Sequence, residues 1–182
     1  MSYFVFVDNS NVWIEGKYAS AVKKGWVPNV AVAHSSHILD NAWKMDFGKL
    51  LNCITCGGTN HIKEANIFGS KPTENDTLWN AMERAGFKVN NPHRNASNKE
   101  KKVDTGTVTA IDRALFKQAK PGDTFILAMG DTDYVPIVQN IKGEGFDVAV
   151  AFWNNVSGEL AAEVTKFIDL TPHIDEITYT GE

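Results

Sequence analysis

The sequence lacks the long apolar run and the excess of positive charge that mark two large classes of protein. No apolar stretch approaches the ~18 residues of a membrane span, and the start MSYFVFVDNSN has no signal-peptide pattern, so we expect an intracellular, cytoplasmic protein with no membrane partner. The formal net charge is −4 and the pI is about 5.7, which excludes a basic protein that coats nucleic acid by bulk electrostatics. A polyanion would have to be bound by a local basic patch or through metal ions.

Internal repeats, low-complexity tracts and Pro- or Gly-rich linkers are also absent. The composition is 43% hydrophobic and 22% charged, as in an ordinary globular protein. A chain of 182 residues is long enough for one domain with a proper core and short for two. We therefore expect residues 1–182 to form a single domain.

Cysteine is scarce, and the two cysteines stand together in the sequence CITC, at Cys53 and Cys56. A CxxC pair is typical of a redox centre or of half a zinc site, but there is no second CxxC, and His61 would add only a third ligand. A helix that ends at the following glycines explains the pair more simply, so we expect a structural role. The pair His34 and His37 is likewise interpreted as a surface feature.

Short apolar segments alternate with helical patterns along the chain. The segment YFVFV is continuously apolar, as expected of a parallel strand buried on both faces. The alternation predicts an α/β fold, a three-layer α/β/α sandwich around a mainly parallel sheet with right-handed crossovers. The expected strands are 3–7, 64–69, 87–91, 124–129, 147–153 and 167–170, and the expected helices are 11–24, 46–54, 75–86, 104–119, 133–145 and 157–167, with irregular chain at 25–37 and a loop at 91–102.

Acidic and amide side chains follow the ends of these strands. Asp8 ends the first strand and Asn11 follows it, Asp131 and Asp133 come just after the fourth, and Asp104 is expected to begin the helix that leads into the fourth. Ligands of open parallel sheets bind beyond the carboxyl ends of the strands, where the strand order reverses. With a strand order of 3-2-1-4-5, three or four carboxylates would face one crevice. For any one of them alone, a turn or a helix cap is the simpler interpretation.

Several carboxylates in one place repel one another, and most would be protonated unless a cation lay among them. Oxygen ligands with no adjacent Cys or His select a hard divalent ion, so we expect Mg²⁺ or Mn²⁺ as the cofactor. Such an ion polarises a phosphate and generates hydroxide from water, which suits phosphoryl chemistry. Asn11 and Thr132 fit a supporting role, in which they orient Asp8 and contact water or phosphate.

Three blocks of the sequence carry a family resemblance: FVFVDNSN, KKVDTGTVTAIDRAL and LAMGDTDYVPIVQNIKGEGFDVAV. They read as a strand ending D-x-x-N, a K-x-V-D helix start, and G-D-[ST]-D-[FY] before an amphipathic helix. Over residues 3–153 their order and spacing resemble the NYN domains, LabA-like members of the PIN-like nuclease superfamily, and the third block is the most specific. The resemblance implies a PIN-like (Rossmann-like) topology and a metal-dependent ribonuclease that hydrolyses phosphodiester bonds of RNA.

The resemblance also implies roles for individual residues, which we take as the expected catalytic set. Asp8, Asp104 and Asp131 match the acidic metal ligands of the family, Asp133 matches an accessory acid, and Asn11 matches the amide of the first block.

Two features depart from the family pattern. Lys102 stands where many members have glycine, so the entry to the Asp104 helix is expected to differ. The segment 16–45 is longer than the corresponding part of a minimal family member, which makes it a candidate for shaping substrate access or a partner surface.

Asp112 lies about 12 Å along the helix from Asp104, too far to share an ion, and is given a structural role. Three tryptophans are expected in the core, namely Trp13, Trp79 and Trp153.

Basic residues near the expected site are candidates for phosphate contacts. They would neutralise phosphates beside a scissile bond, so a nucleic acid is the expected partner, RNA in preference to DNA. For any single lysine, a solvated loop residue is the simpler interpretation. The candidate substrate-binding residues are Lys71, Lys99, Lys101, Lys102 and Thr132, with His93 and Arg94 in the same loop as the last three lysines.

Three alternative functions were compared with the nuclease hypothesis. A haloacid-dehalogenase-type phosphatase needs a second Asp two residues after the first, where this chain has Ser10. A Rossmann nucleotide-binding domain needs a Gly-rich turn after the first strand, and DNSN contains no glycine. A non-catalytic RNA-binding or regulatory module on a PIN-like fold stays open, because fold alone does not prove function.

Overall fold

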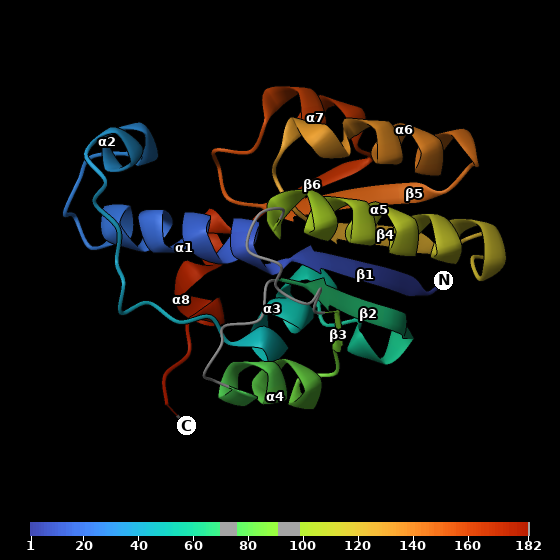
Figure 1. Cartoon of the computed structure of the whole chain (residues 1–182), viewed down its shortest axis with the longest axis horizontal. Coiled ribbons are helices and arrows are strands. Elements are labelled where there is room, and N and C mark those ends of the chain that lie inside the picture. The colour runs from blue at the N-terminus through green and yellow to red at the C-terminus, as the bar shows by residue number, and fades with distance from the viewer. Residues whose placement is uncertain (70–75, 91–98, 182) are drawn as a thin grey trace.

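Six parallel strands form one sheet in the order β3-β2-β1-β4-β5-β6 (Figure 1). The structure is a computed structural model that describes residues 1–69, 76–90 and 99–181, except for the side chains of residues 76 and 99–104. The order confirms the predicted arrangement 3-2-1-4-5, with the expected short strand added beside β5. The strands are β1 (Tyr3–Asp8), β2 (Ile62–Phe68), β3 (Lys88–Asn90), β4 (Thr124–Ala128), β5 (Asp147–Phe152) and β6 (Lys166–Asp169).

β1 lies inside the sheet and pairs with β2 on one side and β4 on the other. Its residues Phe4, Val5, Phe6 and Val7 are completely buried, since helices cover the side chains on both faces. The Phe4 ring stacks on Phe125 of β4, with the ring centroids 5.3 Å apart. Each fully buried Val or Phe side chain contributes about 1.5–3 kcal/mol of transfer free energy, so this strand anchors the core.

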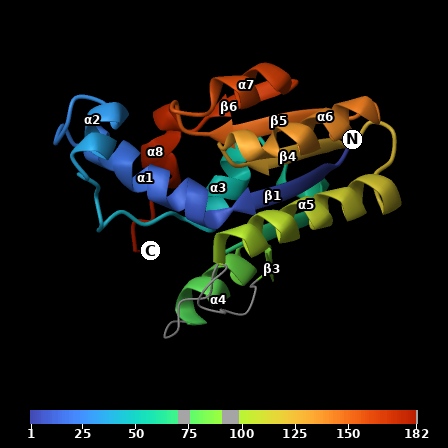
Figure 2. The same ribbon diagram turned by 45° about the horizontal axis from the view of Figure 1, so that its top comes forward.

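Helices cover both faces of the sheet. In the described residues they are α1 (Asn9–Lys23), α2 (Val30–Ser35), α3 (Phe47–Ile54), α4 (Asp76–Arg84), α5 (Lys99–Lys117), α6 (Val135–Gly143), α7 (Gly158–Glu163) and α8 (Ile174–Ile177), with 3₁₀ turns η1 (Thr59–His61), η2 (Thr132–Tyr134) and η3 (Thr171–His173). Right-handed crossovers place the helices after β1 and β2 on one face and those after β3, β4 and β5 on the other. Figures 1 and 2 show α5, α6 and α7 gathered on one side, which confirms the predicted three-layer sandwich.

Two predicted helix boundaries are wrong. α5 begins at Lys99 and not at Asp104, because the Lys and Glu residues before Asp104 are good helix formers that extend the helix toward its N-terminus. α7 ends at Glu163, several residues early, because Val164 is extended and leads the chain into β6. The first correction bears directly on the candidate site.

α2 is a helix in a segment that was expected to be irregular. Asn29 caps it, since its side chain accepts the Val32 N–H at 2.9 Å. α2 packs on the far half of α1 through Ala21, Val27 and Ala33, which form a small apolar cluster separate from the main core. Figure 1 shows α2 at the end of the molecule, beyond the strands.

The turn that follows α3 uses the left-handed region at two successive residues. Cys56 has φ of 51° and Gly57 has φ of 78°, and the Gly57 N–H donates to the Asn52 carbonyl at 2.8 Å. The helix ends before the glycines, as expected, but the first left-handed residue after the C-cap Thr55 is Cys56 and not a glycine, a conformation that L-residues rarely adopt.

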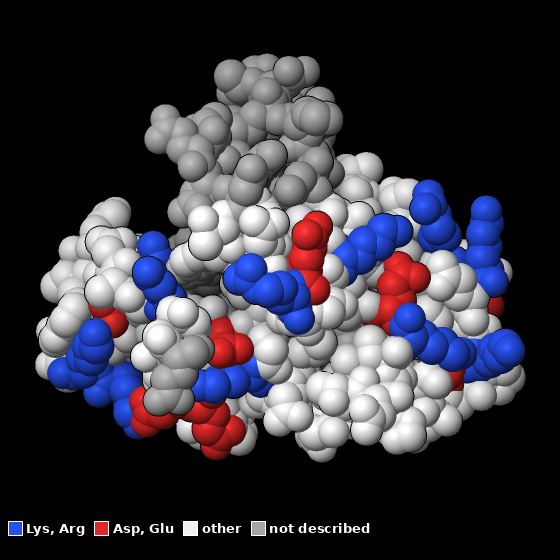
Figure 3. Space-filling model, turned by 90° about the horizontal axis from the view of Figure 1, so that it is seen from below, with Lys and Arg blue, Asp and Glu red and all other residues white. Residues whose placement is uncertain are grey.

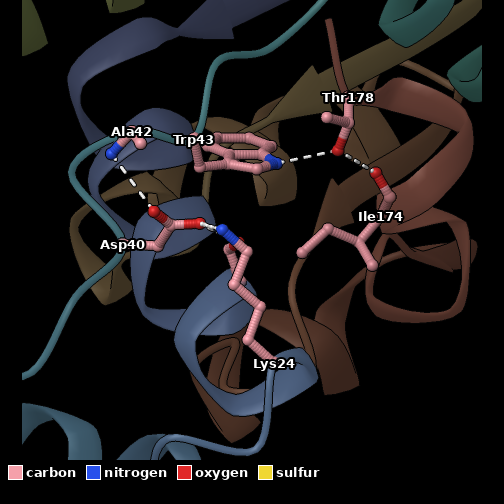
Figure 4. A network of polar contacts seen from close by, with 7 residues as sticks. Lys24, Asp40, Ala42, Trp43, Ile174 and Thr178 are labelled. Carbon is pink, nitrogen blue, oxygen red and sulfur yellow. Dashed lines mark hydrogen bonds and ion pairs between the residues drawn. The ribbon is translucent and has the colours of Figure 1, made fainter. Parts of the chain in front are cut away.

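The segment 16–45 is attached to the molecule through a buried carboxylate, Asp40, whose exposed fraction is 1% (Figure 4). Its Oδ2 accepts from Ser20 Oγ at 2.7 Å and from Lys24 Nζ at 2.6 Å, and its Oδ1 accepts from Ala42 N at 3.1 Å. Burial raises the pKa of Asp40, but the hydrogen bonds from Lys24 and Ser20 outweigh it, so the pKa lies below its ordinary value.

Trp43 joins the same segment to the C-terminal part of the chain. Its Nε1 donates to Thr178 Oγ1 at 2.9 Å, and that hydroxyl donates to the Ile174 carbonyl at 2.6 Å (Figure 4). The indole also lies against Gly16 of α1, where a Cβ would stand 2.4 Å from a ring carbon. Trp43 therefore lies against both α1 and the end of α8.

We predict that Lys24→Met destabilises the protein at pH 7 by about 1–3 kcal/mol, because a buried carboxylate loses a charged hydrogen-bond donor. Since the folded-state pKa of Asp40 is lowered, its contribution is present above the unfolded pKa of about 3.9 and is lost as the pH falls through the folded value. The difference in the free energy of unfolding between Lys24→Met and wild type should therefore become smaller below about pH 4. Urea unfolding at a series of pH values measures it.

Lys23→Met is the matched control, because Lys23 pairs only with the exposed Asp175, at 3.1 Å, among the described residues. This substitution should change the free energy of unfolding by less than about 0.5 kcal/mol at every pH of the series. Equal effects of the two substitutions would contradict the role given to Asp40.

Candidate active site

Asp8 ends β1 and at the same time caps α1, and only 6% of it is exposed. Its Oδ1 accepts the Asn11 N–H at 3.3 Å, as in an N-cap, and its Oδ2 accepts from the Tyr134 hydroxyl at 2.9 Å. Asp8 is therefore a helix cap, as the simpler interpretation had it, but capping uses only Oδ1. Oδ2 accepts from Tyr134, which follows the neighbouring strand β4. The carboxylate is held in one orientation by both contacts.

Asn11 connects the end of β1 to the loop after β4. Its Oδ1 accepts the Gly130 N–H at 2.8 Å, and its Nδ2 donates to Asp131 Oδ2 at 3.3 Å. One amide thus uses its acceptor to fix the loop backbone and its donor to orient the Asp131 carboxylate. The structure brings Asp8, Asn11 and Asp131 together, as the sequence predicted.

The loop after β4 continues into η2, and its side chains face solvent. Asp131, Thr132 and Asp133 are all exposed, and Asp131 stands at the N-terminus of η2 without capping it. The residue before them, Gly130, has no room for a side chain, because a Cβ there would lie 2.2 Å from the Phe152 ring. The close approach of this loop to β5 explains why the Asp131 motif begins with glycine.

Asp104 lies in the second turn of α5, so the structure excludes a role for it as the cap of that helix. α5 packs against β1 and β2, and Thr107, three residues further, is fully buried. The side chain of Asp104 lies outside the described residues. The same holds for the side chains of Lys99, Lys101 and Lys102 and for the whole of Lys71, His93 and Arg94.

The other sequence-based assignments concern structural residues. Trp79 and Trp153 are buried, as predicted, and Trp13 is partly buried. Asp112 is partly buried in α5, and within the described part of the chain its Oδ1 has no hydrogen-bond partner. Nothing in the structure explains this orphaned oxygen.

Two residues at the site were not predicted. Tyr134 was treated only as part of a motif, whereas its buried hydroxyl contacts Asp8. The aromatic position of the G-D-[ST]-D-[FY] block was the signal that pointed to it. Asn9 is 6% exposed next to Asp8, and among the described residues its Oδ1 accepts no hydrogen bond. The run of amides after β1 gave no means of telling Asn9 from Asn11.

We predict that Tyr134→Phe lowers the free energy of unfolding by about 1–3 kcal/mol, because a buried carboxylate loses a donor while the ring stays in place. Chemical denaturation of the variant and of wild type measures the loss. Tyr179→Phe is the matched control, since 47% of Tyr179 is exposed, and it should leave stability within about 0.5 kcal/mol. If the two variants unfold alike, the hydroxyl of Tyr134 does not support Asp8.

None of the described helices is long and apolar enough to cross a membrane.

Comparison with known proteins identifies the family. No curated protein matches the sequence. Among solved structures, the crystal structure of a protein of unknown function from Vibrio parahaemolyticus RIMD 2210633 is similar, with a TM-score of 0.67 and 16% identity over 98% of this chain and 96% of that chain. At this identity the likeness shows the fold alone. The model of the NYN domain matches residues 4–171, nearly the whole sequence, and the chain therefore belongs to the NYN domain family of PIN-like proteins.

Proposed function

We propose that residues 1–182 act as one NYN domain, a metal-dependent ribonuclease that hydrolyses phosphodiester bonds of RNA. Asp8, Asp104 and Asp131 are the proposed metal ligands, Asp133 is an accessory acid, and Mg²⁺ or Mn²⁺ is the cofactor. The observation that carries the proposal is the position of Asn11, whose backbone N–H donates to Asp8 Oδ1 and whose side chain donates to Asp131 Oδ2. A turn that served only the fold would not need to orient an exposed carboxylate from the neighbouring strand.

The described donor set fits such an ion. Asp8 and Asp131 offer carboxylate oxygens, which are the ligands that hard divalent cations prefer, and the Asn11 amide orients Asp131 through its NH2 group without offering an oxygen of its own. When bound, the ion would polarise the phosphate and supply hydroxide at neutral pH. The oxygens of Asp8 already have fixed donors, so this ligand is oriented before any ion arrives.

The remaining residues of the site have proposed roles in binding the substrate. Thr132 lies on the exposed surface of η2, beside Asp131, where a nucleic-acid backbone can reach it. The proposed phosphate contacts come from Lys71, Lys99, Lys101 and Lys102. On the face in Figure 3, basic side chains are interspersed with acidic ones. A small number of placed lysines suits this charge distribution.

The proposed activity is tested by incubating labelled RNA and DNA oligomers with the protein in Mg²⁺, Mn²⁺ or EDTA. We expect cleavage of RNA that requires a divalent ion and stops in EDTA. Binding of RNA without cleavage under every condition would overturn the nuclease and support a non-catalytic RNA-binding module.

We predict that Asp8→Asn lowers the cleavage rate by about a hundredfold or more, because a metal ligand stabilises the transition state by a few kcal/mol. The metal-free variant should melt no lower than wild type, since Asn still caps α1 and one repelling charge is gone. Wild type should gain thermal stability on adding Mg²⁺ or Mn²⁺, and the variant should gain less. Melting temperatures with and without metal, beside cleavage rates, check both parts.

Asp147→Asn is the matched control for Asp8→Asn. Asp147 is also a strand-terminal aspartate, but it is exposed and begins β5, at the amino edge of the sheet. This variant should keep the rate and the metal response of wild type. A near wild-type rate in Asp8→Asn would contradict the assignment of Asp8 as a metal ligand.

We predict that alanine at both Lys101 and Lys102 weakens RNA binding equally across sequences. The slope of log K against log salt should fall by about 1.4, because each phosphate contact with a single strand contributes about 0.7. Alanine at both Lys117 and Lys120, at the other end of α5, is the control and should leave the slope unchanged. An unchanged slope in the Lys101 and Lys102 variant would contradict the proposed phosphate contacts and would leave both residues as ordinary solvated lysines.

A further inference from the structure

A second group of potential ligands lies on other elements than the candidate active site. Cys53 in α3, His173 at the end of η3 and Glu176 in α8 each offer a ligand atom, and these atoms all lie within 4.8 Å of one another. His173 Nδ1 is 3.0 Å from Glu176 Oε2. The CITC motif could not indicate this group, because its two partners come from a segment more than half the chain away.

The three residues are held by packing of the elements that carry them. α3 and α8 lie side by side (Figures 1 and 2). Ile54, next to Cys53, is buried, and α8 is anchored by the buried side chains of Ile174 and Ile177. The backbones that present the thiol, the imidazole and the carboxylate are thus fixed by the core, while the ligand groups themselves reach the surface.

The donor chemistry differs from that of the Asp8 site. One thiol, one imidazole and one carboxylate are the ligands that Zn²⁺ takes, at bond lengths of about 2.0–2.3 Å. The ligand atoms of a filled tetrahedral site lie about 3.5 Å apart, so the 3.0 Å separation of His173 Nδ1 and Glu176 Oε2 would have to open, and any pair near the 4.8 Å limit would have to close. The Glu176 side chain is 68% exposed and that of His173 is 42% exposed, so both have room to rotate.

Zn²⁺ would bind Cys53 as the thiolate, because the ion deprotonates a coordinating thiol, and its charge would neutralise the Glu176 carboxylate. The second thiol of the motif has a different neighbour, since Lys166 Nζ approaches Cys56 Sγ at 4.0 Å.

We propose that Cys53, His173 and Glu176 form a zinc site with three protein ligands and a fourth position open to water. The ion would cross-link α3 to the C-terminal segment η3–α8. The site is independent of the proposed nuclease centre, since it uses different residues and a softer metal. Because it exists only in the folded chain, zinc binding should stabilise the protein.

The test starts from protein stripped of metal by a chelator and titrated with Zn²⁺. We expect one tightly held zinc per chain by elemental analysis and a rise in melting temperature. Substitution with Co²⁺ should give the absorption of a thiolate-to-cobalt charge transfer, which reports a sulfur ligand without any measurement of activity. Cys53→Ser should abolish that absorption, and His173→Gln and Glu176→Gln should each weaken zinc binding by at least about tenfold.

Two variants serve as controls. Cys56→Ser removes a thiol from the same motif but not from the three-residue group, and it should keep both zinc and the cobalt absorption. Asp8→Asn should also keep them, which separates a failure here from a failure of the nuclease proposal. Should Cys53→Ser fail to fold, the loss of zinc affinity in Glu176→Gln still tests the site, since the Glu176 side chain is exposed. Absence of the charge-transfer band in wild type, or equal loss in Cys56→Ser and Cys53→Ser, would overturn the assignment.

Discussion

The parallel pairing of β1 with β4 is the constraint on which the candidate active site depends. Val7 stands opposite Ala128 in this pairing, so both strands end at the same edge of the sheet. Neighbouring strands are about 4.8 Å apart, a gap that one short side chain can span. Asn11 spans it, and any slip in the β1–β4 register would move Asp131 out of its reach.

The same arrangement places a buried carboxylate next to an exposed one. Asp8 is almost completely buried, and Asp131 is fixed beside it by a shared amide neighbour. The hydroxyl of Tyr134 and the Asn11 N–H offset part of the desolvation cost of Asp8, since both donate to its carboxylate. The two hydrogen bonds therefore hold the carboxylate of Asp8 in place at the end of β1.

The sequence was sufficient to predict what depends on local pattern. Short apolar or β-rich segments between helical patterns indicated all six strands, and the acids at the strand ends indicated the candidate site, because a parallel sheet brings those ends to one edge. The start of α5 was misjudged, since polar residues without period were interpreted as a loop although lysine and glutamate form helices well. The contact of Tyr134 with Asp8 and the approach of His173 to Cys53 depend on packing between distant segments, which no local pattern encodes.

The small cluster of Ala21, Val27 and Ala33 has a consequence for the dynamics of the chain. Because these side chains are separate from the main core, α2 can open while the sheet stays intact. Amide protons in α2 would then exchange with solvent through local fluctuations, whereas those of β1, paired on both sides, would exchange only when the whole molecule unfolds. Sequence changes in α2 are therefore expected to leave the acidic edge of the sheet undisturbed, since its apolar contacts are separate from those of the main core.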